Sequence, residues 1–87
     1  MKLSTRTRYG LRAIVNIAKS ADRPISSESI ADCESISKKY LDGILAELRK
    51  AGLVQSFRGQ NGGYMLARHA GEITVTDVIA ALEGGIC

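Results

Sequence analysis

The 87-residue sequence contains little of several residue types, and each scarcity excludes a class of protein. Two cysteines, one histidine and no CxxC pair provide neither a disulfide framework nor the ligand spacing of a structural zinc site. Tryptophan is absent and aromatic residues make up 5% of the chain, so leucine, isoleucine, valine and alanine must fill the core. No apolar run approaches the roughly 20 residues that a membrane helix needs.

What is present indicates one small globular domain spanning residues 1–87. Apolar residues at 45% suffice for a core, and charged residues at 24% suit an ordinary surface. The first residues run directly into a polar, basic segment rather than an apolar signal sequence, so we expect a cytoplasmic protein with no membrane partner. The net charge of +3 leans weakly toward polyanionic partners.

Hydrophobic periodicity predicts four helices, over about residues 5–21, 27–33, 38–51 and 75–83. The last three begin with a shared pattern, in which a serine or threonine follows one aliphatic residue and precedes another by four positions. This pattern predicts an N-cap with a hydrophobic staple. The predicted caps are Ser26, Ser37 and Thr74, and the staple pairs are Ile25 with Ile30, Ile36 with Leu41, and Ile73 with Val78.

Two short apolar runs, residues 53–57 and 64–67, predict strands joined by the glycine-rich loop RGQNGG at 58–63. Such a loop could cradle a phosphate for chemistry, form an ordinary hairpin tip, or contact a nucleic-acid backbone. A nucleotide-binding P-loop requires GxxxxGK followed by Ser or Thr, which is absent. An ordinary turn explains the glycines, but not the arginine, glutamine and asparagine together.

The second and third predicted helices have the layout of a helix-turn-helix, with Ala31 as the small residue at their contact. Ser35 occupies the turn, where glycine would supply a positive φ at no cost. A generic helical hairpin is the alternative. The hairpin that follows favours an α+β, mostly helical fold, a winged helix-turn-helix with a two-stranded wing.

In that fold the recognition helix, about 38–51, faces the major groove and the wing, 58–63, reaches the minor groove. The predicted DNA-binding residues are Ser37, Lys38, Lys39, Tyr40, Asp42, Arg58, Gly59, Gln60, Asn61, Gly62, Gly63 and Tyr64. The lysines suit phosphates, and the glycines would let the wing backbone approach the sugar–phosphate wall. Asp42 could accept from a cytosine amino group or be a solvated helix residue. We expect Lys39 and Arg58 to share one exposed cationic surface.

Three stretches closely resemble the Rrf-two family of bacterial transcription regulators: TRYGLRAIVNIA (7–18), ISKKYLDGILAELRKAGLVQSFRGQNGGYMLAR (36–68) and ITVTDVIAALEG (73–84). That family includes the iron–sulfur cluster regulator, the nitric-oxide-sensing repressor and the cysteine-metabolism repressor. The resemblance implies a homodimer that binds a palindromic operator, usually represses it, and places Arg58 in the minor groove. The family's operator-reading positions fall on Ser37, Tyr40, Asp42 and Gly43. Gly43 departs from the larger polar residue often found there.

Family members continue with a loop of three cysteines that holds an iron–sulfur cluster, and then with a long dimerisation helix. The 87 residues therefore resemble the DNA-binding part of a longer protein, and a cluster would belong to that longer form. Cys87 is either a cluster ligand or a terminal thiol, since a cluster needs about four protein ligands. We expect Cys33 to be a small packing residue and His69 to be solvated.

The sequence thus predicts a DNA-binding transcriptional regulator. The alternative is a winged helix used as a protein-interaction module, which would carry an exposed apolar patch on the third helix. Enzyme chemistry is not expected, because no nucleophile is paired with a base and no metal-ligand spacing occurs.

Overall fold

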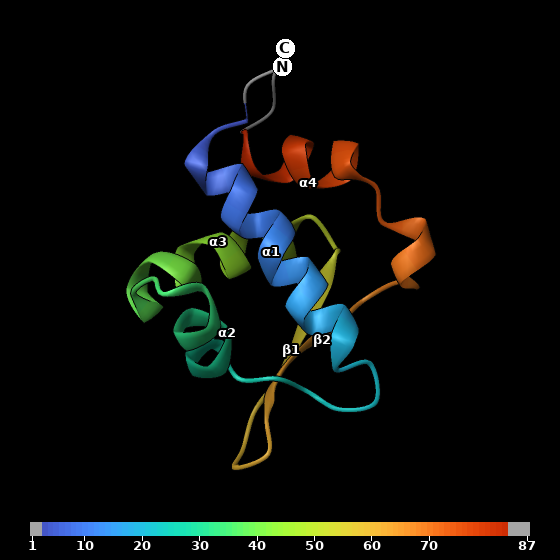
Figure 1. Cartoon of the computed structure of the whole chain (residues 1–87). Helices are drawn as coiled ribbons and strands as arrows, with labels where there is room; N and C mark the ends of the chain where they lie inside the picture. Colours follow the sequence, from blue (N-terminus) through green and yellow to red (C-terminus); the bar gives the residue numbers. More distant parts are fainter. Residues whose placement is uncertain (1–2, 84–87) are drawn as a thin grey trace.

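The computed structural model describes residues 3–83 and confirms the winged helix-turn-helix fold (Figure 1). The elements are α1 (Thr5–Lys19), α2 (Ser27–Glu34), α3 (Lys38–Lys50), β1 (Val54–Phe57), β2 (Gly63–Leu66), a short 3-10 helix η1 (Ala70–Glu72) and α4 (Val75–Leu82). Within residues 3–83, every helix is too short or too polar to cross a bilayer.

The three predicted helix caps are confirmed. The hydroxyl oxygens of Ser26, Ser37 and Thr74 each accept a hydrogen bond from a backbone N–H in the first turn of α2, α3 or α4. Asp77 accepts in turn from the backbone N–H of Thr74, which completes a capping box at the start of α4. Ser4 caps α1 in the same way, which the sequence analysis missed.

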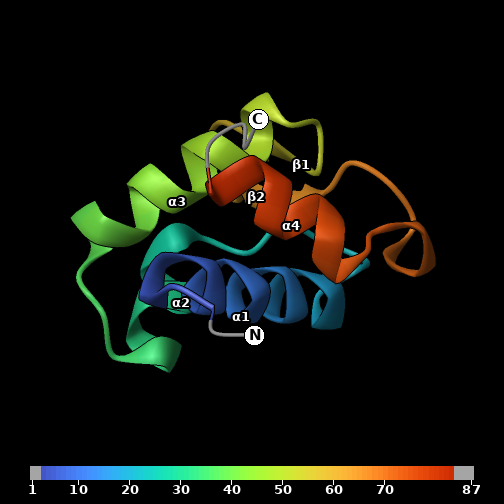
Figure 2. The same cartoon turned by 90° about the horizontal axis from the view of Figure 1, so that it is seen from above.

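One hydrophobic core joins α1, α3 and α4 to the base of the hairpin, and in Figure 2 α4 packs against both α1 and α3. The fully buried large side chains are Ile17, Ile30, Leu41, Ile44, Leu45, Leu48, Leu53, Val54, Val78 and Thr7. The outer staple residues Ile25, Ile36 and Ile73 pack against this core, as their spacing predicts. The caps therefore start each helix where its apolar face meets the core.

Two details of α1 and α2 differ from the prediction. Helix α1 ends at Lys19 rather than residue 21, because the N–H of Ser20 bonds to the carbonyl of Ile17 and the chain turns away. Ala21 is consequently exposed instead of facing the core. Cys33 is also exposed, since the short α2 buries only Ile30 and Ala31, so its predicted packing role is wrong.

The hairpin is tied to the helix-turn-helix by the backbone. Strands β1 and β2 pair antiparallel, with Phe57 opposite Gly63. Tyr64 then exchanges two backbone hydrogen bonds with Ile25, at 2.8 and 3.0 Å, directly before the cap of α2. Figure 1 shows the hairpin projecting from the helical body on the side away from α4. This bridge holds the wing beside the start of α2.

Candidate nucleic-acid interface

Lys38 and Arg58 line one hollow between the wing and the first turns of α2 and α3. Lys38 is the first residue of α3, and Arg58 directly follows β1 at the wing tip. Both side chains are exposed, and Glu28 is the one acidic residue lining the same hollow within residues 3–83. The structure therefore brings two predicted cations from different elements to one open surface.

Lys38 is already engaged by a neighbour on its own helix. Its ammonium lies 2.9 Å from the carboxylate of Asp42, one turn further along α3. The hydrogen bond and the charge of Asp42 raise the pKa of Lys38 above its ordinary value. The two side chains remain 51% and 43% exposed, so water and other anions can compete for either partner. Asp42 is thus a partner of Lys38 and still an open acceptor.

The fold itself requires the wing glycines, which the sequence led us to expect only for a close approach to the DNA backbone. Gly63 has a φ of +148°, and a Cβ there would overlap the carbonyl of Ile25. A Cβ at Gly62 would overlap the carbonyl of Phe57. Gly59 has open space around it but a φ of +106°, which a side chain would strain. The loop therefore requires glycine at these positions to close, whether or not a ligand approaches.

Lys39 faces a different hollow from Lys38. It lines a surface depression with Ser37, Tyr40, Gly43 and Arg6, on the α1 side of the recognition helix. Consecutive residues on a helix are rotated by about 100°, so adjacent lysines cannot face the same way. Lys39 and Arg58 are both exposed as expected, but the lysine that shares a hollow with Arg58 is Lys38.

A network that the sequence analysis missed holds Tyr40 in place. Its ring meets the ring of Tyr9 edge-on at 6.2 Å between centroids, and the Arg12 guanidinium lies 5.7 Å from the Tyr9 centroid. Arg12 also pairs with Glu34 at 3.1 Å. A hydrogen bond from the Asn16 amide, followed by the Arg12 contacts, lowers the pKa of Glu34. The residues of α1 thereby orient one of the predicted recognition side chains.

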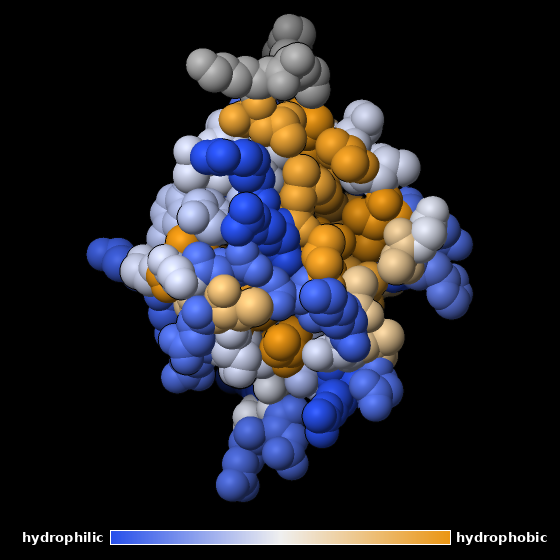
Figure 3. All heavy atoms as spheres, in the orientation of Figure 1, coloured by the Kyte–Doolittle hydropathy of each residue, from blue (hydrophilic) through white to orange (hydrophobic). Residues whose placement is uncertain are grey.

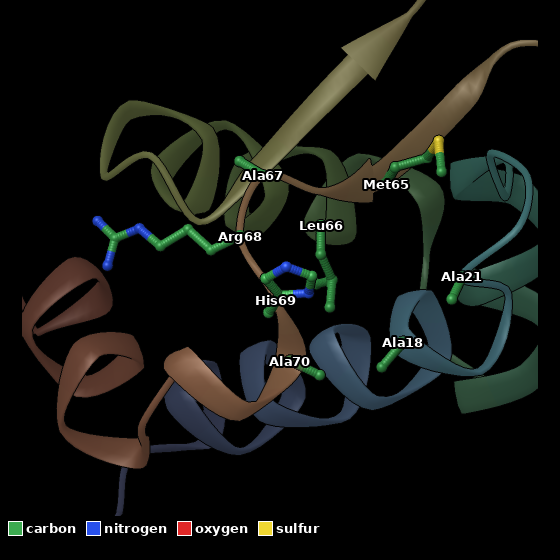
Figure 4. Close-up of a pocket in the computed structure, with 8 residues that line it drawn as sticks. All are labelled: Ala18, Ala21, Met65, Leu66, Ala67, Arg68, His69 and Ala70. Atoms are coloured by element: carbon green, nitrogen blue, oxygen red, sulfur yellow. The ribbon is translucent and has the colours of Figure 1, made fainter.

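A further hollow lies on the other side of the hairpin, between the end of α1 and β2 (Figure 4). Its lining is mostly small or apolar, and no carboxylate or hydroxyl of the described chain contributes to it: Ala18, Ala21, Met65, Leu66, Ala67, Arg68, His69 and Ala70. In Figure 4 Arg68 extends away from the group. His69 is exposed, as predicted. This hollow lacks the paired groups that acid–base or nucleophilic chemistry requires.

The described residues do not fit an iron–sulfur cluster. No group of three or more histidine, cysteine or acidic side chains that could hold a metal occurs within residues 3–83. Cys33 is the one cysteine in this range, and a cluster needs about four protein ligands. The other predicted candidate, Cys87, lies outside the described residues.

Comparison with known proteins gives consistent matches. The Rrf2 family model, described as an iron-dependent transcriptional regulator, matches residues 3–87. Protein rrf2 of Nitratidesulfovibrio vulgaris is 48% identical over 84 residues, which are 95% of this chain and 56% of that protein. The HTH-type transcriptional regulator CymR of Bacillus subtilis is 45% identical over 87 residues, which are 99% of this chain and 63% of that protein. This chain thus spans less than two thirds of the length of these relatives.

Solved structures agree with the curated relatives. The structure of CymR, the global cysteine regulator of B. subtilis, superposes with a TM-score of 0.93 at 42% identity, covering 99% of this chain and 67% of that one. T. potens IscR superposes with a TM-score of 0.89 at 44% identity, covering 100% of this chain and 64% of that one.

Proposed function

Since this chain belongs to the Rrf2 family of transcriptional regulators, which are not enzymes, we propose that it binds a double-stranded DNA operator sequence-specifically and represses the adjacent promoter. A bacterial protein that binds chromosomal DNA would act in the cytoplasm. The residues of this chain support DNA binding. Repression of the promoter by the whole protein is also part of the proposal.

The observation that carries the proposal is the hollow shared by Lys38 and Arg58. Cations from the recognition helix and from the wing lie on one exposed surface, as a protein that spans adjacent grooves requires. Lys38 would exchange its contact with Asp42 for a phosphate. Asp42, once released, could accept from a cytosine amino group in the major groove.

The remaining predicted residues divide between the two grooves. Ser37 and Tyr40 lie at the exposed start of α3 and would contact base edges or phosphates. Arg58 would enter the narrow minor groove, where the negative potential is concentrated. The wing residues Gly59, Gln60, Asn61, Gly62, Gly63 and Tyr64 would hold that arginine against the sugar–phosphate backbone.

The protein-interaction alternative is less well supported. It requires an apolar exposed patch on α3, whereas the exposed large hydrophobic side chains within residues 3–83 are Val15, Tyr40, Phe57 and Val75. Of these, only Tyr40 lies on α3, and it carries a hydroxyl. The recognition helix therefore presents a polar surface, which suits DNA better than an apolar partner.

We also propose a homodimer that places two recognition helices on half-sites about 34 Å apart. Val15 of α1 and Val75 of α4 are 53% and 55% exposed, and Figure 3 shows apolar surface in the region of these helices. The wing end of the molecule in the same view is hydrophilic. Apolar surface away from the wing is available for a second copy. We further propose that an iron–sulfur cluster would belong to a longer form of this protein, because no group of side chains within residues 3–83 could hold a metal.

Binding can be tested with a labelled duplex that the protein itself enriches from a random library. The Arg58→Ala variant should bind this duplex more weakly by roughly 1–3 kcal/mol, because it loses the minor-groove cation. Arg68→Ala is the matched control, since it removes an exposed arginine from the other end of the hairpin. Fluorescence anisotropy over a salt titration measures both.

If the wild-type chain binds the enriched and a scrambled duplex equally at every salt concentration, specific recognition is refuted. Equal losses in the Arg58 and Arg68 variants would instead show that only net charge matters, and would remove the wing from the proposed interface.

A further inference from the structure

Arg6 crosses from α1 to the recognition helix. It lies in the first turn of α1, and its guanidinium Nη2 donates a hydrogen bond to the backbone carbonyl of Gly43 at 3.3 Å. The two residues are 37 positions apart in the chain. The Arg6 side chain, although part of α1, therefore lies against the surface of α3.

Gly43 lies beside the Arg6 guanidinium. It is exposed in the middle of α3, where glycine lowers helix stability by roughly 1 kcal/mol relative to alanine. A Cβ at this position would lie 3.9 Å from Nη1 of Arg6. The Arg6 guanidinium would thus be in ordinary van der Waals contact with a Cβ at position 43. The Arg6 guanidinium of α1 therefore lies next to Gly43, a position at which the recognition helix has no side chain.

The surroundings of Arg6 leave its charge available. Among residues 3–83, no carboxylate forms an ion pair with Arg6, whereas Arg12 pairs with Glu34 and Lys38 with Asp42. Arg6 lines its hollow together with Lys39, Ser37 and Tyr40, and no acidic residue of the described chain lines it. One guanidinium, one ammonium and two hydroxyl groups around an open depression are suited to the oxygens of a phosphate.

We propose that Arg6 and Lys39 form a second phosphate-binding site on the α1 side of the recognition helix, and that its ligand is the DNA backbone. This inference rests on the proposed DNA binding. The Lys38–Arg58 hollow lies on the wing side of α3, so the two sites would bracket the helix and hold the strands on both sides of the major groove. Arg6 would set the depth and angle of the helix rather than read a base.

The test compares Arg6→Ala with Arg8→Ala in the 87-residue chain, using the enriched duplex. Arg8 is exposed on the same helix, and among the described residues its side chain donates a hydrogen bond only to Thr5 of its own turn, so its removal costs the same charge at another place. Arg6→Ala should weaken binding about tenfold at low salt. It should also reduce, by about one, the slope of the logarithm of the binding constant against the logarithm of the salt concentration, and by the same amount for every duplex sequence tested. Arg8→Ala should leave affinity within about twofold of the wild type and the slope unchanged.

Arg58→Ala serves as the positive control, and thermal unfolding of each variant verifies the fold. If Arg58→Ala weakens binding while Arg6→Ala matches Arg8→Ala, the second site is disproved and the proposed function stands. If Arg6→Ala weakens binding only to duplexes that carry a particular base pair, the guanidinium contacts a guanine edge and the phosphate assignment is overturned. If the wild-type chain has no preferred duplex, both proposals fall.

Discussion

At the scale of single residues, the position of the wing depends on a missing side chain. Gly63 begins β2 directly beside Ile25, and the next residue, Tyr64, forms the two backbone hydrogen bonds that tie the hairpin to α2. The backbone approach is close because Gly63 has no Cβ to keep Ile25 and Ser26 at a distance. Sequence alone indicates a turn here, but not which glycine is constrained.

Gly63→Ala should destabilise the protein by roughly 1–3 kcal/mol, because alanine is strained at a φ of +148° and its Cβ would overlap the Ile25 carbonyl. Urea denaturation measures the free energy of unfolding. Gly71→Ala is the control, since that glycine is exposed and has open space around it; a change within about 0.5 kcal/mol is expected there. Equal effects of the two substitutions would contradict the proposed role of Gly63.

At the scale of elements, polar caps determine where the short helices begin. Helix α4 has only eight residues, so it has few internal hydrogen bonds to offset its unpaired ends. The capping box satisfies the backbone N–H groups of Thr74 and Asp77, each of which donates to the other residue's side chain at 3.0 Å. The hydrogen bond from the Thr74 backbone lowers the pKa of Asp77. Helix α4 in turn packs against α1 and α3, so its start affects the whole core.

Thr74→Ala should lower the free energy of unfolding by about 1 kcal/mol, because the first turn of α4 loses its hydroxyl acceptor. Thr74→Ser retains that acceptor and should be close to neutral. Chemical denaturation of the two variants provides the comparison. A serine variant as unstable as the alanine variant would indicate that the threonine methyl group, not the cap, matters.

At the scale of the whole molecule, carboxylates at two junctions between helices are stabilised in their charged form. Hydrogen bonds from Asn16 and then Arg12 lower the pKa of Glu34, which connects α2 to α1. Hydrogen bonds from the hydroxyl groups of Ser4 and Thr7 lower the pKa of Glu83, which connects the end of α4 to the start of α1. Thr7 is fully buried, and this contact satisfies its hydroxyl.

A carboxyl group whose pKa is lowered by folding stabilises the protein above its ordinary pKa and loses that contribution as the pH falls through the lowered value. The ordinary values for Glu34 and Glu83 are 4.5, so stability should be flat above about pH 5 and decline below about pH 4.5. Urea denaturation over an acid pH series measures this decline. Glu34→Gln should show a shallower acid dependence than the wild type; an unchanged slope would exclude Glu34 as a contributor.

Local sequence patterns predict the four α-helices, the two strands and their order along the chain, but not the short 3-10 helix η1. Recurring apolar residues predict α3 over 38–51 against the observed Lys38–Lys50, and the serine and threonine caps are found where the pattern places them. The serine in the helix-turn-helix adopts the positive φ, +57°, that the turn requires. These features depend on hydrogen bonds and contacts within a few residues, so local spacing contains the information.

Contacts between side chains of different elements could not be predicted from these local patterns. The tertiary structure pairs Lys38, not Lys39, with the wing arginine in one hollow, places Arg6 over Gly43, buries Thr7 against Glu83 and exposes Cys33. Each outcome depends on how one helix is rotated and crossed against another. That rotation is determined by packing between residues far apart in the chain, and no local pattern encodes it.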